Sequence, residues 1–191
     1  MAELLDERSR AYLRARRDDD ILCDLDPHKA HHASGLLLLQ CGDADISCGL
    51  LDHYRQLSGC DRIHQITVNG GALNLSSASP VPRRRAYAIT GLQLMYEIEE
   101  ACSLKGLDKV VVCGHSACGA GRAAKLSEED AMRLIVQGKL ELREFFHRRG
   151  REHIEIGSMM HVRWNGDEPR LYFLDAARYA RTFMPAPLTG T

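Results

Sequence analysis

The chain has 191 residues, with 25 lysines and arginines against 26 aspartates and glutamates, and a formal net charge of -1 at pH 7. This balance argues against a nucleic-acid partner, because nucleic-acid-binding proteins usually carry a basic excess. Charged residues at 27% and apolar residues at 45% are ordinary values for a globular protein and exclude disorder throughout the chain.

Location and domain organisation follow from simple features of the chain. Apolar runs such as Leu36 to Leu39 are far shorter than the roughly 20 residues of a membrane helix, so we expect no membrane partner. The N-terminus is charged from residue 3 and lacks an apolar secretory segment, which predicts a cytoplasmic protein. The seven cysteines are then expected to serve metal binding, catalysis or burial rather than disulfides. The length favours one domain, residues 1–191, that begins with a helical arm over residues 1–20.

The first predicted element is a helix over residues 2–17. Its apolar stripe is thin among many charges and consists of Leu4, Leu5, Ala11, Tyr12 and Ala15. So narrow a stripe does not supply enough burial within its own domain to stabilise a helix. The helix is therefore either solvated or packs as an arm on a partner subunit.

Strands and helices alternate through the middle of the chain. Continuous apolar runs predict buried strands over residues 36–41 and 109–113, and residues 63–68, closed by Asn69-Gly70-Gly71, predict another. Apolar spacing, capping signals and glycine stops predict helices over residues 50–57, 91–105 and 127–149, with Gly138 as a point where the last could break.

The remaining segments complete the predicted architecture. Residues 76–86 contain two prolines and three consecutive arginines and predict a loop. Asn165-Gly166, between HVRW and RLYFL, predicts a C-terminal β-hairpin. The whole order predicts an α/β fold with a mostly parallel central sheet flanked by helices.

Cysteine and histidine side chains follow two of these strands, at the edge where parallel sheets bind their ligands. Cys41-Gly42-Asp43 ends one strand, and His115 and Cys118 follow another in a spacing that lets both side chains reach one ion. Two thiolates and an imidazole suit Zn²⁺ better than Mg²⁺ or Ca²⁺. The fourth position is left for water or for Asp43. Cys48 is an alternative ligand, and the other interpretation is buried thiols with a surface histidine.

At these residues the sequence resembles the β-class carbonic anhydrase family. The family motif C-x-D-x-R corresponds to Cys41-Gly42-Asp43-Ala44-Asp45, and its GHS-x-CG motif corresponds to Gly114-His115-Ser116-Ala117-Cys118-Gly119. The resemblance covers roughly residues 36–125. It implies the family's fold, zinc bound by Cys41, His115 and Cys118, and a zinc-bound hydroxide that reversibly hydrates CO₂ to bicarbonate.

The same resemblance implies roles for other residues and for partners. Asp43 is either a fourth zinc ligand, which closes the site, or a catalytic carboxylate beside a zinc-bound water, and further pocket candidates are Asp45, Asn69, Gly70 and Gly119. The small-molecule partner is CO₂ with bicarbonate, or a CO₂-like molecule. The family also implies a homodimer or larger homo-oligomer whose N-terminal helix reaches across subunits.

Two departures from the family pattern bear on activity. Asp45 replaces the arginine that holds the aspartate off the metal, and Val68 stands where the family has a second arginine. Exchanging a cation for an anion at about 7 Å changes the energy of a unit charge by roughly 5 kcal/mol at an effective dielectric of about 20. We therefore expect weak or altered CO₂ hydration. The alternatives are an inactive zinc-binding protein closed by Asp43 and a hydrolase of carbonyl sulfide or carbon disulfide.

Basic residues elsewhere could replace the missing arginine. Arg62 and Arg122 are the first candidates because they lie near the motifs in the sequence, whereas the run Arg83-Arg84-Arg85 is more simply a solvated loop. His31 and His32 precede the first buried strand. They either line the cleft as proton shuttles or form an ordinary surface pair.

Overall fold

The computed structural model describes residues 5–82, 90–164 and 170–184, and the side chains of residues 29 and 44–48 lie outside this description. Within these residues six strands form one sheet in the order β1-β6-β5-β4-β2-β3. They are β1 (Leu22–Asp24), β2 (Leu36–Cys41), β3 (Ile63–Val68), β4 (Lys109–Ser116), β5 (Glu155–Val162) and β6 (Arg170–Leu174). The four strands β3, β2, β4 and β5 are parallel, and β6 and β1 add antiparallel pairs at one side. The predicted α/β fold is confirmed.

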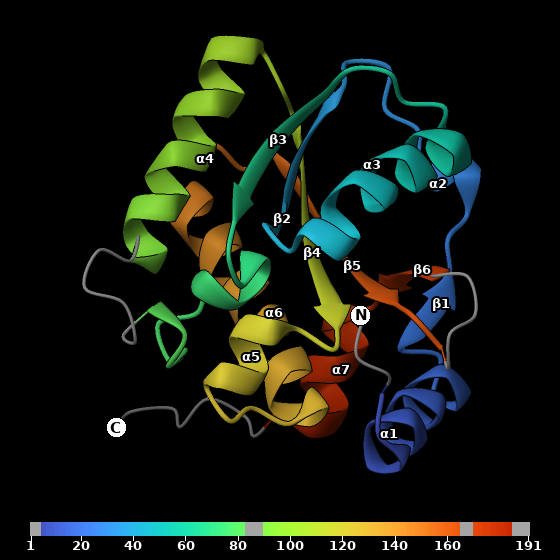
Figure 1. Cartoon of the computed structure of the whole chain (residues 1–191). Helices are drawn as coiled ribbons and strands as arrows, with labels where there is room; N and C mark the ends of the chain where they lie inside the picture. The colour runs from blue at the N-terminus through green and yellow to red at the C-terminus, as the bar shows by residue number, and fades with distance from the viewer. Residues whose placement is uncertain (1–4, 83–89, 165–169, 185–191) are drawn as a thin grey trace.

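Helices cover both faces of the sheet (Figure 1). On one face lie α2 (Pro27–Ala30) and α3 (Ala44–Ser58), whose Leu50 and Tyr54 belong to a small core with Leu38 and Val111. On the other face α4 (Gly91–Lys105) and α6 (Glu128–Arg148) enclose the larger core. The shorter helical segments are α1 (Glu7–Asp18), η1 (Gly71–Asn74), α5 (Gly119–Ala123) and α7 (Ala176–Phe183). No helix among the described segments is long and apolar enough to cross a bilayer.

Most predicted strands are found where the sequence placed them. The strands over residues 36–41 and 63–68 are confirmed, and the third strand continues past residue 113 to Ser116. β5 and β6 pair antiparallel as the predicted hairpin, although its turn at Asn165-Gly166 lies outside the described residues. Residues 76–82 form turns and short irregular stretches, as predicted for a loop, and residues 83–86 of that loop lie outside the described residues.

The N-terminal helix corrects one expectation. α1 begins at Glu7, where the Asp6 carboxylate caps the helix by accepting a hydrogen bond from Ser9 N at 2.6 Å. It packs on α6 and β1 of its own chain, and Leu13, which the predicted stripe omitted, is fully buried. The Arg16 guanidinium also stacks on the Phe183 ring of α7. The expectation that this helix gains too little burial within its own domain was therefore wrong.

A second correction concerns Gly138, because α6 runs unbroken through it over 21 residues. The glycine is needed for packing rather than for a break. A Cβ at this position would lie 2.8 Å from Leu75 Cβ and 3.0 Å from Ser76 N, in the segment that follows η1. α6 thus approaches the backbone after β3 closely, and this contact holds the segment that borders the carboxyl edge of the sheet.

We expect Gly138→Ala to lower the free energy of unfolding by about 1–3 kcal/mol, because an added methyl group would overpack this contact. The loss should appear despite the helix propensity of alanine, which is better than that of glycine by about 1 kcal/mol. Gly49→Ala in α3 is the matched control, since no atom lies within 4 Å of its added Cβ. Urea unfolding followed by circular dichroism measures both. A Gly138→Ala chain as stable as the Gly49→Ala chain would contradict the packing argument.

Candidate metal centre

Three buried side chains meet at the carboxyl edge of the parallel strands. Cys41 is the last residue of β2, His115 lies near the end of β4, and Cys118 precedes the first turn of α5. Their candidate ligand atoms all lie within 4.8 Å of one another. The strand order places β2 next to β4, so the fold itself brings together residues far apart in the sequence. The juxtaposition expected from the sequence is thus present.

The turn after β3 wraps around Cys41. Gly70 adopts a φ of 91°, which favours glycine, and its N–H donates a hydrogen bond to Cys41 Sγ at 3.1 Å. At Gly71 a Cβ would lie 2.6 Å from Cys41 N, so this backbone also needs glycine. Asn69 is exposed, and its carbonyl accepts a hydrogen bond from Asn74 Nδ2 at 3.0 Å. Gly70 is therefore at the site through its backbone, as a support of the thiolate.

The donor set fits a borderline metal ion. His115 is only 5% exposed, and neither of its ring nitrogens has a hydrogen-bond partner among the described groups. A buried polar atom without a partner is costly, and a metal ion would satisfy one of these nitrogens. Two sulfurs and one imidazole in this arrangement are the ligand types of three-ligand zinc sites. The residues present therefore fit zinc, and they leave a fourth position to another group.

The two cysteines differ in acidity. The pKa of the Cys41 thiol falls to about 4, chiefly because the Cys118 thiol hydrogen-bonds to it, with further help from His115 and Gly70 N–H. The same interaction, together with burial, raises the pKa of Cys118. Cys41 is therefore the more acidic thiol of the pair. Thiolates are the form that binds a metal, so of the two cysteines Cys41 loses its proton more readily.

The acidic residues of the first motif follow Cys41 in the chain. Asp43 is partly exposed, and its carboxylate is not among the ligand atoms that are mutually within 4.8 Å. Asp45 belongs to the first turn of α3, but its side chain lies outside the described part of the chain, as does that of Cys48. Gly119 is exposed in the first turn of α5. The fourth-ligand role of Asp43 remains a prediction.

The arginines considered as replacements for the missing one lie at different edges of the sheet. Arg62 donates hydrogen bonds to the carbonyls of Ser34, at 2.7 Å, and Lys105, at the edge where β2 and β3 begin. That edge is opposite the one that holds Cys41, His115 and Cys118, so Arg62 does not replace the missing arginine. Arg122, one turn beyond Cys118, lies on the correct side. The run Arg83-Arg84-Arg85 lies outside the described residues.

The two histidines before β2 also lie at the far edge. His31 Nδ1 lies 3.0 Å from the carbonyl oxygen of Ser58, and His32 faces Asp108 and Glu155, with Nε2 3.5 Å from a Glu155 oxygen. Both contacts are remote from the carboxyl ends of the strands. The cleft-lining role considered for this pair was therefore wrong, and they are peripheral residues of the sheet.

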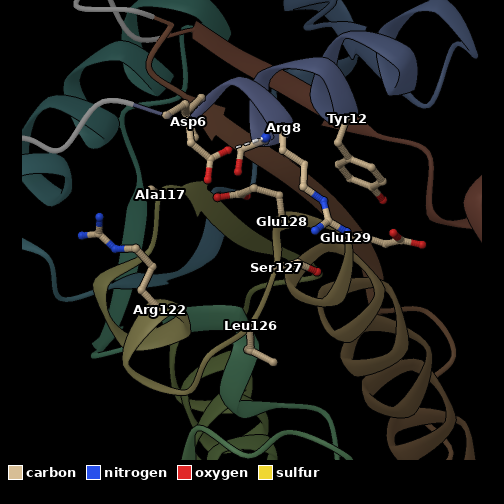
Figure 2. Close-up of a pocket in the computed structure, with 11 residues that line it drawn as sticks. Asp6, Arg8, Tyr12, Ala117, Arg122, Leu126, Ser127, Glu128 and Glu129 are labelled. Atoms are coloured by element: carbon tan, nitrogen blue, oxygen red, sulfur yellow. Dashed lines mark hydrogen bonds between the residues drawn. The ribbon is translucent and has the colours of Figure 1, made fainter.

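A cavity of about 240 Å³ lies against the segment between β4 and α5, and it is bordered by the N-terminal segment and the first turn of α6 (Figure 2). Ala117, between the candidate ligands His115 and Cys118, forms part of its wall. The Asp6 and Glu128 carboxylates point toward each other, while Arg122 is directed away from them. Glu128 accepts a hydrogen bond from Ser116 Oγ at 2.9 Å, and burial raises the pKa of its carboxyl group.

Two residues near the site escaped sequence reasoning. Glu128 looked like an ordinary first-turn acid of a helix, and His161 is a single histidine within the hairpin strand. His161 is 2% exposed and pairs in register with His115 across β4 and β5. Side chains alternate between the two faces of a strand, so the shared face of these histidines follows only once the strand order and the pairing register of β4 and β5 are known.

Comparisons with known proteins place the fold. No protein-family model matches the sequence, and no curated protein matches it significantly. The β-carbonic anhydrase CafD of Aspergillus fumigatus matches in structure with a TM-score of 0.50 and 15% identity, over 80% of this chain and 98% of that chain. A tetrameric β-carbonic anhydrase of Sordaria macrospora matches with a TM-score of 0.40 and 16% identity, over 81% and 89% of the chains. The apo form of a carbon disulfide hydrolase matches with a TM-score of 0.38 and 13% identity, over 83% and 87%. The match to CafD shows a shared fold.

Proposed function

We propose that the chain is a zinc-dependent protein of the β-carbonic anhydrase type that reversibly hydrates CO₂ to bicarbonate, with low activity. The observation that carries the proposal is the buried set of Cys41, His115 and Cys118, whose ligand atoms lie within 4.8 Å of one another. The set stands at the carboxyl edge of the parallel strands, where α/β folds bind their ligands. The fold shared with CafD supports the same function.

Each residue of the site has a task in this proposal. Cys41, His115 and Cys118 hold the ion, and zinc so bound supplies a Lewis acid that activates water near neutral pH. Gly70 N–H donates a hydrogen bond to the Cys41 sulfur, which favours the thiolate form. Asp43 either orients the attacking water or takes the fourth ligand position. Without an arginine two residues further on, we expect the second arrangement to prevail and the activity to be low.

The direct test is CO₂ hydration measured by stopped flow on protein of verified zinc content, with Cys118→Ser as the reference. A zinc-dependent rate in the wild-type protein that Cys118→Ser lacks supports the proposal. If the fully zinc-loaded wild-type protein hydrates CO₂ no faster than Cys118→Ser, the proposal is contradicted.

We also propose that the chain assembles into a homodimer or a larger homo-oligomer, as the family resemblance implies. Light scattering of the full chain at several concentrations should then give at least twice the mass of one chain, which is 21.3 kDa. Since α1 packs on its own chain, the contact does not need α1 to cross between subunits. A concentration-independent monomer would end this proposal and leave the metal site untouched.

A further inference from the structure

A second cavity, of about 610 Å³, lies at the end of the sheet where the parallel strands begin. Lys109, the first residue of β4, and Glu155, the first residue of β5, both line it. The candidate ligand His115 stands near the other end of β4, roughly 20 Å away at about 3.3 Å per strand residue. This cavity is therefore separate from the candidate metal centre.

The wall of this cavity is largely apolar. Side chains from β4, β5, β6, α3 and the segment after β1 contribute to it, and they are Leu25, Tyr54, Val111, Ile156, Met159 and Phe173. The Phe173 ring is 39% exposed, so it offers apolar surface that the fold itself does not cover. Cavities of this size, with apolar walls and a few polar groups, are typical of sites for small organic molecules.

A lysine of α6 brings a positive charge to this wall. Lys139 lines the cavity, and its Nζ donates a hydrogen bond to Ser158 Oγ at 3.2 Å. That hydroxyl in turn donates to the carbonyl of Leu174 at 2.7 Å. An ammonium group has three N–H donors, and Lys139 forms no ion pair within the part of the chain that the structure describes.

The surroundings of this ammonium group are unfavourable to its charge. Burial is the main reason that the pKa of Lys139 is lowered, and the positive charges of Arg143 and Lys109 act in the same direction, whereas Asp175 and Glu155 oppose them. A desolvated charge is costly unless an opposite charge or hydrogen bonds compensate it. An anion in the cavity would supply this compensation.

The other charges of the wall have partners of their own. Lys109 pairs with Glu155, and Asp24 pairs with Arg17 at 3.6 Å. The Asp26 carboxylate accepts a hydrogen bond from a backbone N–H of α2 at 3.0 Å. Lys139 is thus left to balance the charge of a ligand. A singly charged carboxylate matches one ammonium group, whereas a phosphate dianion would bring an uncompensated negative charge into a largely apolar cavity.

We propose that this cavity binds a monocarboxylate with an apolar body, such as a medium-chain fatty acid, with its carboxylate on Lys139 and its chain against Met159 and Phe173. The ammonium group would donate a charge-assisted hydrogen bond to the ligand beside Ser158. The apolar chain would be removed from water on the exposed Phe173 ring. This site is independent of the proposed zinc chemistry.

The test is calorimetric titration of the full chain with octanoate, which should bind with a dissociation constant below about 1 mM. Lys139→Met keeps the apolar stem without the ammonium group and should weaken octanoate binding at least about tenfold. Lys105→Met removes the same charge from an exposed residue at the end of α4 and should bind as the wild type does. Replacing octanoate by 1-octanol should weaken binding to the wild type by a similar factor.

Gly157→Val tests the cavity without touching the lysine. Gly157 lines the cavity, and a Cβ there would meet Val111 Cγ2 at 3.6 Å and Lys109 Cε at 3.7 Å, which are ordinary contacts. Valine therefore fits the strand and fills part of the cavity, so octanoate binding should fall at least about tenfold. Urea unfolding without ligand should show that Gly157→Val and Lys139→Met are both folded, since valine suits a strand and Lys139→Met removes a desolvated charge.

A wild-type dissociation constant above about 10 mM would overturn the inference. Octanoate that binds folded Lys139→Met or folded Gly157→Val as tightly as the wild type would overturn it too. Equal weakening in Lys105→Met would show an effect of net charge alone and would also contradict it. None of these results bears on zinc content or CO₂ hydration, so the proposed function stands or falls separately.

Discussion

Wild-type protein prepared with zinc should hold about one ion per chain, and Cys118→Ser and Cys41→Ser should each lose most of it. Both sulfurs belong to the cluster whose ligand atoms lie within 4.8 Å, and serine supplies no thiolate. Because metal binding is coupled to folding, the urea midpoint of either variant should fall to that of the metal-free protein. Elemental analysis after gel filtration gives the zinc content.

The matched control is Cys60→Ser. Cys60 is also buried, but its thiol donates to the carbonyls of His32 and Arg62 at the opposite edge of the sheet. A serine hydroxyl can make the same kind of bond, and the zinc content should remain that of the wild type. Stoichiometric zinc in both Cys41→Ser and Cys118→Ser would remove these cysteines from the site.

CO₂ hydration by the zinc-loaded wild type should be slow near neutral pH, and Asp45→Arg should raise kcat/KM by at least about tenfold. The reason is electrostatic, because an arginine two residues after Asp43 can pair with that carboxylate and draw it from the zinc. The gain sought is a fraction of the roughly 5 kcal/mol expected for exchanging an anion for a cation at about 7 Å. Stopped-flow hydration of both proteins at equal zinc content measures it.

Asp52→Arg provides the same charge change on the same helix. Asp52 lies in α3 with an exposed side chain and pairs with Arg55 at 3.9 Å, so this variant should leave the rate unchanged. Asp43→Ala should open the site but remove the carboxylate that orients water, which gives little gain. A wild-type rate near the diffusional limit would show that the site is open without the arginine. Arg122 would then be the next residue to replace, since Arg62 lies at the wrong edge of the sheet.

The strands with continuous apolar sequence were the easiest elements to predict. Residues buried on both faces of a parallel sheet need no alternation, so LLLLQC and KVVVC identify β2 and β4 directly. β1 and α2 were missed because three or four residues carry too little local signal. They are stabilised by tertiary contacts, such as the pairing of Leu22 with Leu174.

Some residues of the candidate metal site were likewise predictable from the sequence, and others were not. Cys41, His115 and Cys118 could be found because each follows a predictable strand and carries a distinctive side chain. The location of Arg62 could not, since closeness in sequence to a motif does not say at which end of a strand a residue lies. Nor could the position of Glu128, because the cavity that it lines forms only where the segment around α1 packs against α6.

The candidate metal ligands lie about 75 residues apart along the chain, Cys41 at the end of β2 and His115 and Cys118 at or just after the end of β4. A ribosome adding roughly 5–20 residues per second needs about 4–15 seconds to reach His115 and Cys118 after it has added Cys41. During that interval Cys41 has no metal partner and is open to oxidation or to binding by other ions. We therefore predict that the metal supply during synthesis affects how completely the site is filled. Protein made in zinc-depleted cells should be harder to load than protein made with zinc present from the start.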